Sequence, residues 1–289
     1  MRSEKEIYDL ILDIARNDER ILAVYMNGSR TNINVPKDIF QDYDIVYVVK
    51  ETKSFIEDKK WIHRFGDILY MQYPDEFPGE KNNKENRYAW LMQFTDGVRI
   101  DLSIQTISFT LNHIHDDKLC RILLDKANVL PNIEESSDIT HYVQKPSEIE
   151  FLACANEFWW CSNNIAKGLW RNEIPYVQDM TNFIVRKQLE YMLSWKAGIM
   201  HDFKVSVGKS GKYLYRYLDS QEYQEYLNTY FNKNVEDAWK SVFIMCDLFD
   251  KTAKYVGEQL GYTYNEKEAR GARSFLERVY QLPKDATDI

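Results

Sequence analysis

Residues 41–49 read QDYDIVYVV, and this stretch places Asp42 and Asp44 at the start of an apolar run. The run from Tyr43 to Val49 is rich in β-branched and aromatic residues, which predicts a strand. Because side chains alternate across a strand, residues two apart point to the same face. Two carboxylates held together in this way repel each other unless a cation lies between them. The stretch therefore predicts a strand with a cation bound at its first residues, between Asp42 and Asp44.

A second strand with an acidic position is predicted at residues 98–104, VRIDLSI. Alternation divides it into two faces, one with Arg99, Asp101 and Ser103 and the other with Ile100, Leu102 and Ile104. Asp101 thus interrupts a strand that otherwise suits the interior of a sheet. If this strand lies beside residues 43–49, Asp101 converges with the two earlier aspartates. An oxygen-rich pocket of this kind is the chemistry that Mg²⁺ selects.

A Gly-Ser turn follows an earlier predicted strand. The apolar run from Ile21 to Met26 ends at Asn27-Gly28-Ser29-Arg30. Such a turn lets backbone amides and a hydroxyl approach a polyphosphate closely. Anion donors beside a carboxylate-bound metal make a site for a nucleoside triphosphate, with metal ions holding the α-phosphate for in-line attack by a hydroxyl. The implied reaction is nucleotidyl transfer.

The remaining pattern predicts an α+β chain of two domains. Further elements are predicted as helices at Glu4–Ala15 and around Asp116–Asp125, and as strands at Asp67–Tyr73 and Trp90–Phe94. A stretch of small and polar residues with a proline, Asp138–Pro146, suits a linker. After it the apolar spacing is helical and fits four or five helices. We therefore expect a mixed-sheet domain at residues 1–140 and a helical-bundle domain at residues 146–289.

Composition excludes several classes of protein. The 289 residues include 37 Lys and Arg against 45 Asp and Glu, a net charge of −8. That length exceeds the usual size of one hydrophobic core, and the acidic balance argues against a nucleic-acid-binding protein, whose affinity comes largely from phosphate neutralisation. No signal peptide or membrane-length apolar stretch is seen, and four scattered cysteines have no metal-type spacing. We expect a cytoplasmic protein with reduced thiols, no membrane contact, and a monomeric or weakly dimeric state.

The ordered set Gly28-Ser29, Asp42-Tyr43-Asp44 and Asp101 resembles the polymerase-beta-type nucleotidyltransferase superfamily. Longer segments spread over nearly the whole chain are similar to the aminoglycoside 6-adenylyltransferases that inactivate streptomycin. These segments are YMNGSRTN, DIFQDYDIVYVV, GVRIDLSI, EFWWCSNNIAKGLWRNEIPY and VGKSGKYLYRYL. The resemblance implies an N-terminal nucleotidyltransferase domain and a C-terminal helical domain. It also implies ATP as co-substrate, Mg²⁺ as cofactor, and AMP transfer to a streptomycin hydroxyl, which gives antibiotic resistance.

The resemblance assigns roles to the acidic residues and to the Gly-Ser turn. Asp42 and Asp44 match the metal-binding pair, and Gly28-Ser29, with Arg30 after it, matches the nucleotide turn. Asp101 matches the third carboxylate. In related antibiotic nucleotidyltransferases that position, or a carboxylate of the helical domain, can be the general base, so Asp101 is either a metal ligand or the base.

The helical domain supplies further candidate contacts. Lys209, Lys212 and Arg216 would neutralise phosphate, the last two on one face of a helix that begins near Ser210. The alternative is a solvated basic surface. A second group would bind a guanidinium-bearing, sugar-like cation by stacking and by charged hydrogen bonds; it comprises Trp170, Glu173 and Asp179. For Trp170 the alternative is core packing.

The sequence is also compatible with two other functions. The acceptor could be another small hydroxyl compound or a protein side chain, with the same fold and reaction. The chain could also be a catalytically inactive nucleotide-binding protein, although its three aspartates argue against that.

Overall fold

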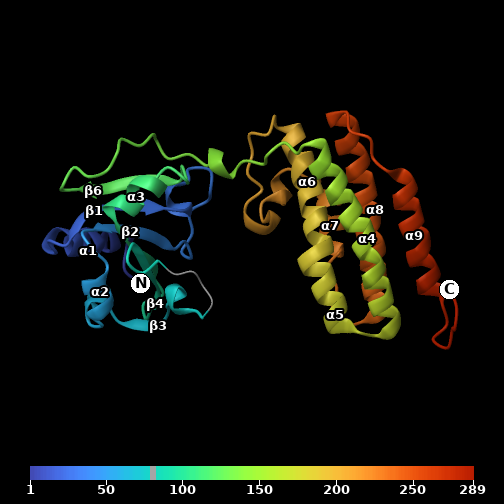
Figure 1. Ribbon diagram of the computed structural model, residues 1–289, viewed down its shortest axis with the longest axis horizontal. Helices are drawn as coiled ribbons and strands as arrows, with labels where there is room; N and C mark the ends of the chain where they lie inside the picture. Colours follow the sequence, from blue (N-terminus) through green and yellow to red (C-terminus); the bar gives the residue numbers. More distant parts are fainter. Residues whose placement is uncertain (79–82) are drawn as a thin grey trace. The chain divides into compact units, whose positions relative to one another are not determined.

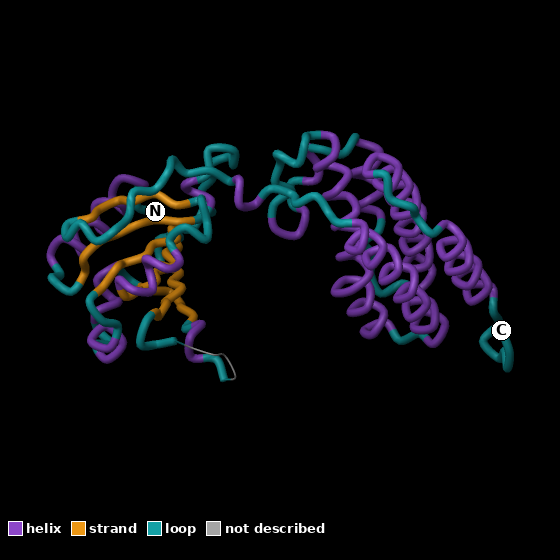
Figure 2. Tube along the Cα trace, turned by 45° about the horizontal axis from the view of Figure 1, so that its top comes forward, coloured by secondary structure: helices purple, strands orange, loops and turns teal. Residues whose placement is uncertain are grey.

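A computed structural model describes residues 1–78 and 83–289 of the chain. Its contacts divide the chain into two compact units, Met1–Thr140 and His141–Ile289. The first unit combines a sheet with short helices, and the second is built from helices and loops (Figures 1 and 2). This division of strands and helices confirms the predicted α+β class.

The sheet of the first unit has six strands within the described residues, in the spatial order β3-β4-β5-β2-β1-β6. Their bounds are β1 Ile21–Asn27, β2 Tyr43–Val49, β3 Ile68–Gln72, β4 Arg87–Phe94, β5 Arg99–Thr106 and β6 Cys120–Asp125. β2 and β5 run parallel, whereas the other neighbouring pairs run antiparallel. The sheet is therefore mixed, as predicted, and its one parallel pair joins the two strands that carry the aspartates.

Both faces of this sheet are covered. α1 (Glu4–Asn17), α2 (Lys53–Glu57) and a 3₁₀ turn at Trp61–Phe65 pack on one face, where α1 buries Ile7, Ile11 and Ala15 at four-residue steps. α3 (Ile107–His113) and residues 129–133 cover the other face. Because β2 lies between these layers, its apolar residues are buried on both sides and only its first residues reach the surface.

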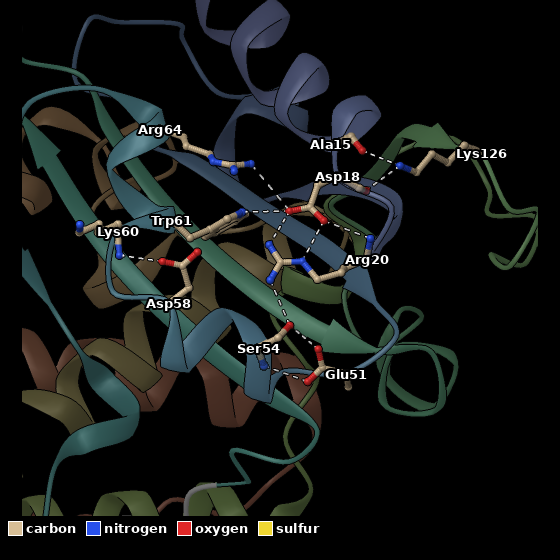
Figure 3. Close-up of polar contacts among 10 residues, drawn as sticks. All are labelled: Ala15, Asp18, Arg20, Glu51, Ser54, Asp58, Lys60, Trp61, Arg64 and Lys126. Atoms are coloured by element: carbon tan, nitrogen blue, oxygen red, sulfur yellow. Dashed lines mark hydrogen bonds and ion pairs between the residues drawn. The ribbon is translucent and has the colours of Figure 1, made fainter.

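A buried carboxylate, Asp18, joins α1 to β1 at the end of β1 that lies far from Asn27 (Figure 3). Asp18 accepts hydrogen bonds from Arg20 Nε at 2.9 Å and Nη2 at 2.6 Å, and from Trp61 Nε1 at 3.1 Å. Lys126 Nζ donates to the backbone oxygens of Ala15 and Asp18. The hydrogen bonds from Arg20 lower the pKa of Asp18 to about 2. The cluster fixes where β1 begins and contains none of the three aspartates predicted to converge.

The second unit contains six α-helices, two of which are joined by a π-helix at Met180–Val185 into one unbroken segment, so that five separate helical segments result, within the four or five predicted. The α-helices are α4 Glu148–Arg171, α5 Ile174–Asp179, α6 Arg186–Met200, α7 Ser220–Asn228, α8 Val235–Leu260 and α9 Glu266–Gln281. α4 begins at a capping box made by Ser147 and Glu150, and it ends where Asn172 adopts the left-handed conformation. Its neighbours α6, α8 and α9 pack along it around one apolar core (Figure 1).

One predicted element is wrong. Residues 116–125 were expected as a helix, but Cys120–Asp125 form the edge strand β6, antiparallel to β1. Ile122, Leu123 and Leu124 are consecutive apolar residues, and Ile122 packs on the opposite face of the sheet from the two leucines. A short run of this kind does not distinguish helix from strand by its period, so pairing with β1 decides the outcome. Among the described residues, none of the helices has the length and apolar character of a membrane span.

Candidate active site

Asp44 and Asp101 lie side by side on the parallel strands β2 and β5, directly paired in register. Asp101 is 17% exposed and Asp44 is half-buried. Burial, and after it the charges of Asp101 and Asp42, raise the pKa of Asp44 to about 6. Burial also raises the pKa of Asp42, with Asp101 contributing. The three carboxylates therefore lie near one another at the start of β2, and we call the group Asp42, Asp44 and Asp101 the acidic edge.

The sheet produces this convergence by its register. Asn27 of β1 pairs with Asp44, so the side chains of Asn27, Asp44 and Asp101 follow one line across three neighbouring strands. The Oδ1 atom of Asn27 is buried and accepts no hydrogen bond from the described residues. This unpaired acceptor beside three carboxylates makes this part of the molecule rich in oxygen ligands.

Gly28 brings the turn after β1 against the carboxylate of Asp44, which lies in the space that a Cβ at this position would need. The Gly28 amide donates to the backbone oxygen of Leu119 at 3.2 Å, so this amide is engaged within the protein. Ser29 begins a 3₁₀ turn, and its hydroxyl makes no hydrogen bond within residues 1–78 and 83–289. Of the two residues predicted for the nucleotide turn, Ser29 is the one with a free polar group.

Arg30 holds the chain that leads into β2. Its Nη2 donates to the backbone oxygen of Gln41 at 2.8 Å, and its Nε donates to that of Asp42 at 3.1 Å. The guanidinium also lies 3.6 Å from the ring centre of Tyr43. Arg30 was predicted to bind nucleotide; in this structure its hydrogen bonds fix the backbone position of Asp42.

Arg99 lies among the aspartates, and sequence reasoning assigned it no role. Its Nε and Nη2 donate to the two carboxylate oxygens of Asp101 at 2.8 and 2.7 Å, and its Nη1 lies 3.5 Å from Asp42 Oδ2. Strand alternation had already placed Arg99 on the same face as Asp101. That periodicity indicates a shared face, but it does not show that the guanidinium folds back onto the neighbouring carboxylate.

The donor set at this edge suits a hard divalent cation, since it consists of carboxylate oxygens with an amide oxygen beside them. In this structure Arg99 already occupies the oxygens of Asp101. Among the residues that the structure describes, no three His, Cys, Asp or Glu side chains are arranged as a ready metal site. The residue types fit Mg²⁺, although their side chains are not arranged as a metal site in this structure.

The basic segment of the second unit is not the helix that was expected. Ser210 and Gly211 have positive φ values of +56° and +67°, which interrupt a helix, and short 3₁₀ turns form instead at Lys209–Gly211 and Leu214–Arg216. Lys212 Nζ lies 5.0 Å from the ring centre of Tyr213, and the Arg216 guanidinium lies 4.3 Å from it. Lys212 and Arg216 thus gather around one tyrosine rather than along a helical face.

A cavity of about 1090 Å³ lies within the second unit. It is lined by parts of α4 and α6, by residues 143–146 and by residues 206–209, so that Lys209 reaches it whereas Lys212 and Arg216 do not. Tyr191 and Trp195 of α6 form a stacked pair on its wall, with ring centres 6.1 Å apart. Glu157 of α4 adds a carboxylate.

The predicted aromatic and acidic group lies elsewhere in the second unit. Trp170 packs against the helical core, and its Nε1 donates to the backbone oxygen of Leu282 at 3.1 Å. Glu173 and Asp179 are exposed at the two ends of α5. None of the three lines the large cavity, and Trp170 is 16 residues further along α4 than Cys154, or roughly 24 Å at the helical rise.

The chain is similar to known proteins over nearly its whole length. The family model described as streptomycin adenylyltransferase matches residues 1–279. Aminoglycoside 6-adenylyltransferase of Bacillus subtilis (strain 168) is 38% identical over 97% of this chain and 99% of its own length. The Campylobacter jejuni protein of the same name is 39% identical over 91% of each chain. A crystal structure of an aminoglycoside 6-adenyltransferase from Bacillus subtilis is similar at 34% identity, covering 97% of this chain and 99% of that one, with a TM-score of 0.48.

These matches extend over both units, including the helical one, and two of the relatives exceed 30% identity over almost their whole length. The convergence of Asp42, Asp44 and Asp101 beside the Gly-Ser turn is the arrangement from which nucleotidyl transfer was inferred. The chain belongs to the streptomycin adenylyltransferase family and is a nucleotidyltransferase.

Proposed function

We propose that this chain transfers AMP from ATP to a hydroxyl group of an aminoglycoside, with streptomycin as the acceptor. The observation that carries the proposal is the pairing of Asp44 with Asp101 on parallel strands, with Asp42 two residues before Asp44. Its relatives that are named aminoglycoside 6-adenylyltransferases support the choice of acceptor class, and the family description supports streptomycin.

The three aspartates would hold Mg²⁺, since carboxylate oxygens are the ligands that this ion prefers. When bound, Mg²⁺ neutralises charge on the phosphates and lowers the pKa of a nearby hydroxyl. The buried acceptor oxygen of Asn27 and the raised pKa of Asp44 support this assignment, because both indicate an edge where added positive charge is favourable.

In the proposed reaction an acceptor oxygen attacks the α-phosphorus of ATP. A new bond forms between that oxygen and the phosphorus, and the bond to the oxygen that bridges to the β-phosphorus breaks. Pyrophosphate leaves, and the hydroxyl proton passes to a carboxylate. Ser29, the residue after Gly28, offers a hydroxyl for a phosphate oxygen, and Arg30 keeps the backbone of Asp42 in place.

Asp101 has two candidate roles, metal ligand and general base. Both of its carboxylate oxygens accept hydrogen bonds from Arg99, which is a permanent cation. A carboxylate of the helical unit is the alternative base. Asp101→Asn separates the roles: loss of a ligand weakens metal binding, whereas loss of the base lowers kcat at unchanged metal affinity.

Two places in the second unit are candidates for acceptor contact. Glu173 and Asp179 are exposed carboxylates. The large cavity offers the Tyr191–Trp195 platform and Glu157, a combination that suits a guanidinium-bearing sugar through stacking and charge. Its volume of about 1090 Å³ is sufficient for a ligand of that size.

The experiment is direct. The purified chain is incubated with ATP, Mg²⁺ and streptomycin, and the product is examined by mass spectrometry for streptomycin carrying one adenylyl group. Parallel reactions use other aminoglycosides, and Asp44→Asn is the control for contaminating activity. Adenylyl-streptomycin that forms only with the unaltered chain supports the proposal. Adenylylation of a different aminoglycoside alone would replace streptomycin, and no transfer to any of them would refute the acceptor class.

A further inference from the structure

The guanidinium of Arg99 lies where its positive charge neutralises carboxylates of the acidic edge. It bonds both oxygens of Asp101 at 2.7 to 2.8 Å and lies 3.5 Å from Asp42 Oδ2. The Asp101 side chain is 17% exposed, Asp42 is 34% exposed and Arg99 is 43% exposed. Arg99 thus bridges the first and third aspartates from the solvent side, and it leaves the more enclosed Asp44 without a hydrogen-bonded counter-ion.

The contact has the geometry of a specific pair rather than that of a loose surface ion pair. Two parallel N–H···O bonds use the fork of the guanidinium and both carboxylate oxygens, an arrangement that fixes orientation as well as charge. Hydrogen bonds to Asp101 and the charges of Asp101, Asp42 and Asp44 raise the pKa of Arg99, so all three carboxylates stabilise this one cation. The guanidinium therefore does in part what a metal ion would do at the same edge.

The two cations compete at these oxygens. Arg99 Nε and Nη2 each use one lone pair of an Asp101 oxygen, and a divalent ion bound to the remaining lone pairs would lie close to the positive charge of the guanidinium and be repelled by it. A cavity of about 400 Å³ adjoins Arg99 on its exposed side and gives the side chain room to move. Arg99 is thus held by the aspartates but is not confined there by packing.

We propose that Arg99 is an internal counter-ion, which holds Asp101 and Asp42 together in the metal-free protein and is displaced from Asp101 when a divalent cation binds. This inference rests on the cation requirement of the proposed function. It makes Arg99 a positioning residue that sets the metal affinity of the free protein below the affinity that the three carboxylates would have alone.

The test measures binding of Mn²⁺ alone, followed by the electron paramagnetic resonance signal of the free ion, to the full chain without nucleotide. We expect Arg99→Gln to bind Mn²⁺ at least about tenfold more tightly than the unaltered chain. Arg99→Lys keeps the charge but lacks the fork, and we expect it to bind with intermediate affinity. The matched control is Arg121→Gln, which removes an exposed arginine of β6 that contacts Tyr8 instead of the aspartates.

A second measurement follows thermal unfolding. In EDTA, Arg99→Gln should melt at a lower temperature than the unaltered chain, because three carboxylates are left without their cation, and saturating Mn²⁺ should recover the difference. Arg121→Gln should show neither effect. If Arg99→Gln proves too unstable to purify, Arg99→Lys carries the test.

Unchanged or weaker Mn²⁺ binding by both Arg99 variants would overturn the inference, since it would show that Arg99 supports the metal-binding geometry or has no influence on it. The absence of Mn²⁺ binding by every variant would overturn it too. The proposed function is decided separately, by transfer of AMP to streptomycin by the unaltered chain, so the two failures are distinguishable.

Discussion

The carboxylate of Asp44 occupies the space that a side chain at Gly28 would need: a Cβ at Gly28 would lie 2.1 Å from Asp44 Oδ2. Gly28 also has a φ of +77°, which L side chains rarely adopt. The glycine therefore serves two purposes, since it makes the turn after β1 and lets that turn approach the acidic edge.

Gly28→Ala should impair catalysis more than folding. The added methyl group must displace the Asp44 carboxylate, and a shift of about 1 Å in a reacting geometry can cost about 100-fold in rate. We expect kcat/KM to fall by about that factor, with stability lowered by about 1–3 kcal/mol from backbone strain. The matched control is Gly261→Ala, because Gly261 has a φ of +74° but nothing within 4 Å of its Cβ position. A Gly261→Ala variant that lost as much activity would remove the explanation.

Asp44→Asn should stabilise the metal-free protein while lowering turnover by orders of magnitude. The pKa of Asp44 is raised to about 6 by burial and by the neighbouring carboxylates. A group with a raised pKa contributes stability at pH below about 4, and that contribution is lost as the pH rises through about 6. In EDTA at pH 8 the variant should therefore be more stable by about 1–3 kcal/mol, with no difference at pH 4. Denaturant unfolding at the two pH values measures this, and equal stability at pH 8 would contradict it.

Asp18→Asn should destabilise the protein at neutral pH, in contrast to Asp44→Asn. The pKa of Asp18 is lowered to about 2, first by its hydrogen bonds from Arg20. A lowered pKa contributes stability above the unfolded pKa of about 4, and this is lost as the pH falls towards 2. We expect a loss of about 2 kcal/mol at pH 7 that shrinks below pH 4, with normal turnover per folded molecule. The exposed pair Lys5–Asp9 provides the control, since Asp9→Asn should change stability by less than about 0.5 kcal/mol.

Alternation predicted the cluster of Asp42, Asp44 and Asp101 on one condition, that the two strands lie side by side. Because Asp42 and Asp44 are two residues apart and Asp101 interrupts an apolar strand, their convergence needed only that β2 and β5 be neighbours, which the structure confirms. The interaction of Arg99 with Asp101 could not be predicted in this way, since strand period specifies a face but not the direction in which a long side chain bends. The turns at Lys209–Arg216 were also missed, because the positive φ values of Ser210 and Gly211 are a local backbone choice that helical spacing does not reveal.

Two tryptophans of the helical unit are candidates for stacking on the acceptor, Trp170 from the sequence and Trp195 from the structure. Trp170 is packed against the core and donates its Nε1 hydrogen to Leu282, so its loss should be expressed mainly as lost stability. Trp195 also packs against this core, but it lines the cavity as well and stacks on the half-exposed Tyr191. Its loss should therefore remove a stacking surface in the cavity in addition to some core packing.

We therefore expect Trp195→Ala to raise the KM for streptomycin about tenfold, as loss of a stacked contact of about 1.4 kcal/mol would do, with little change in the KM for ATP. Trp170→Ala should lower the melting temperature with both KM values nearly unchanged. Steady-state AMP transfer with each substrate varied in turn separates these outcomes. If Glu173→Gln or Asp179→Asn raises the KM for streptomycin while Trp195→Ala does not, the acceptor binds at α5 instead, because those carboxylates lie at the ends of that helix and away from the cavity.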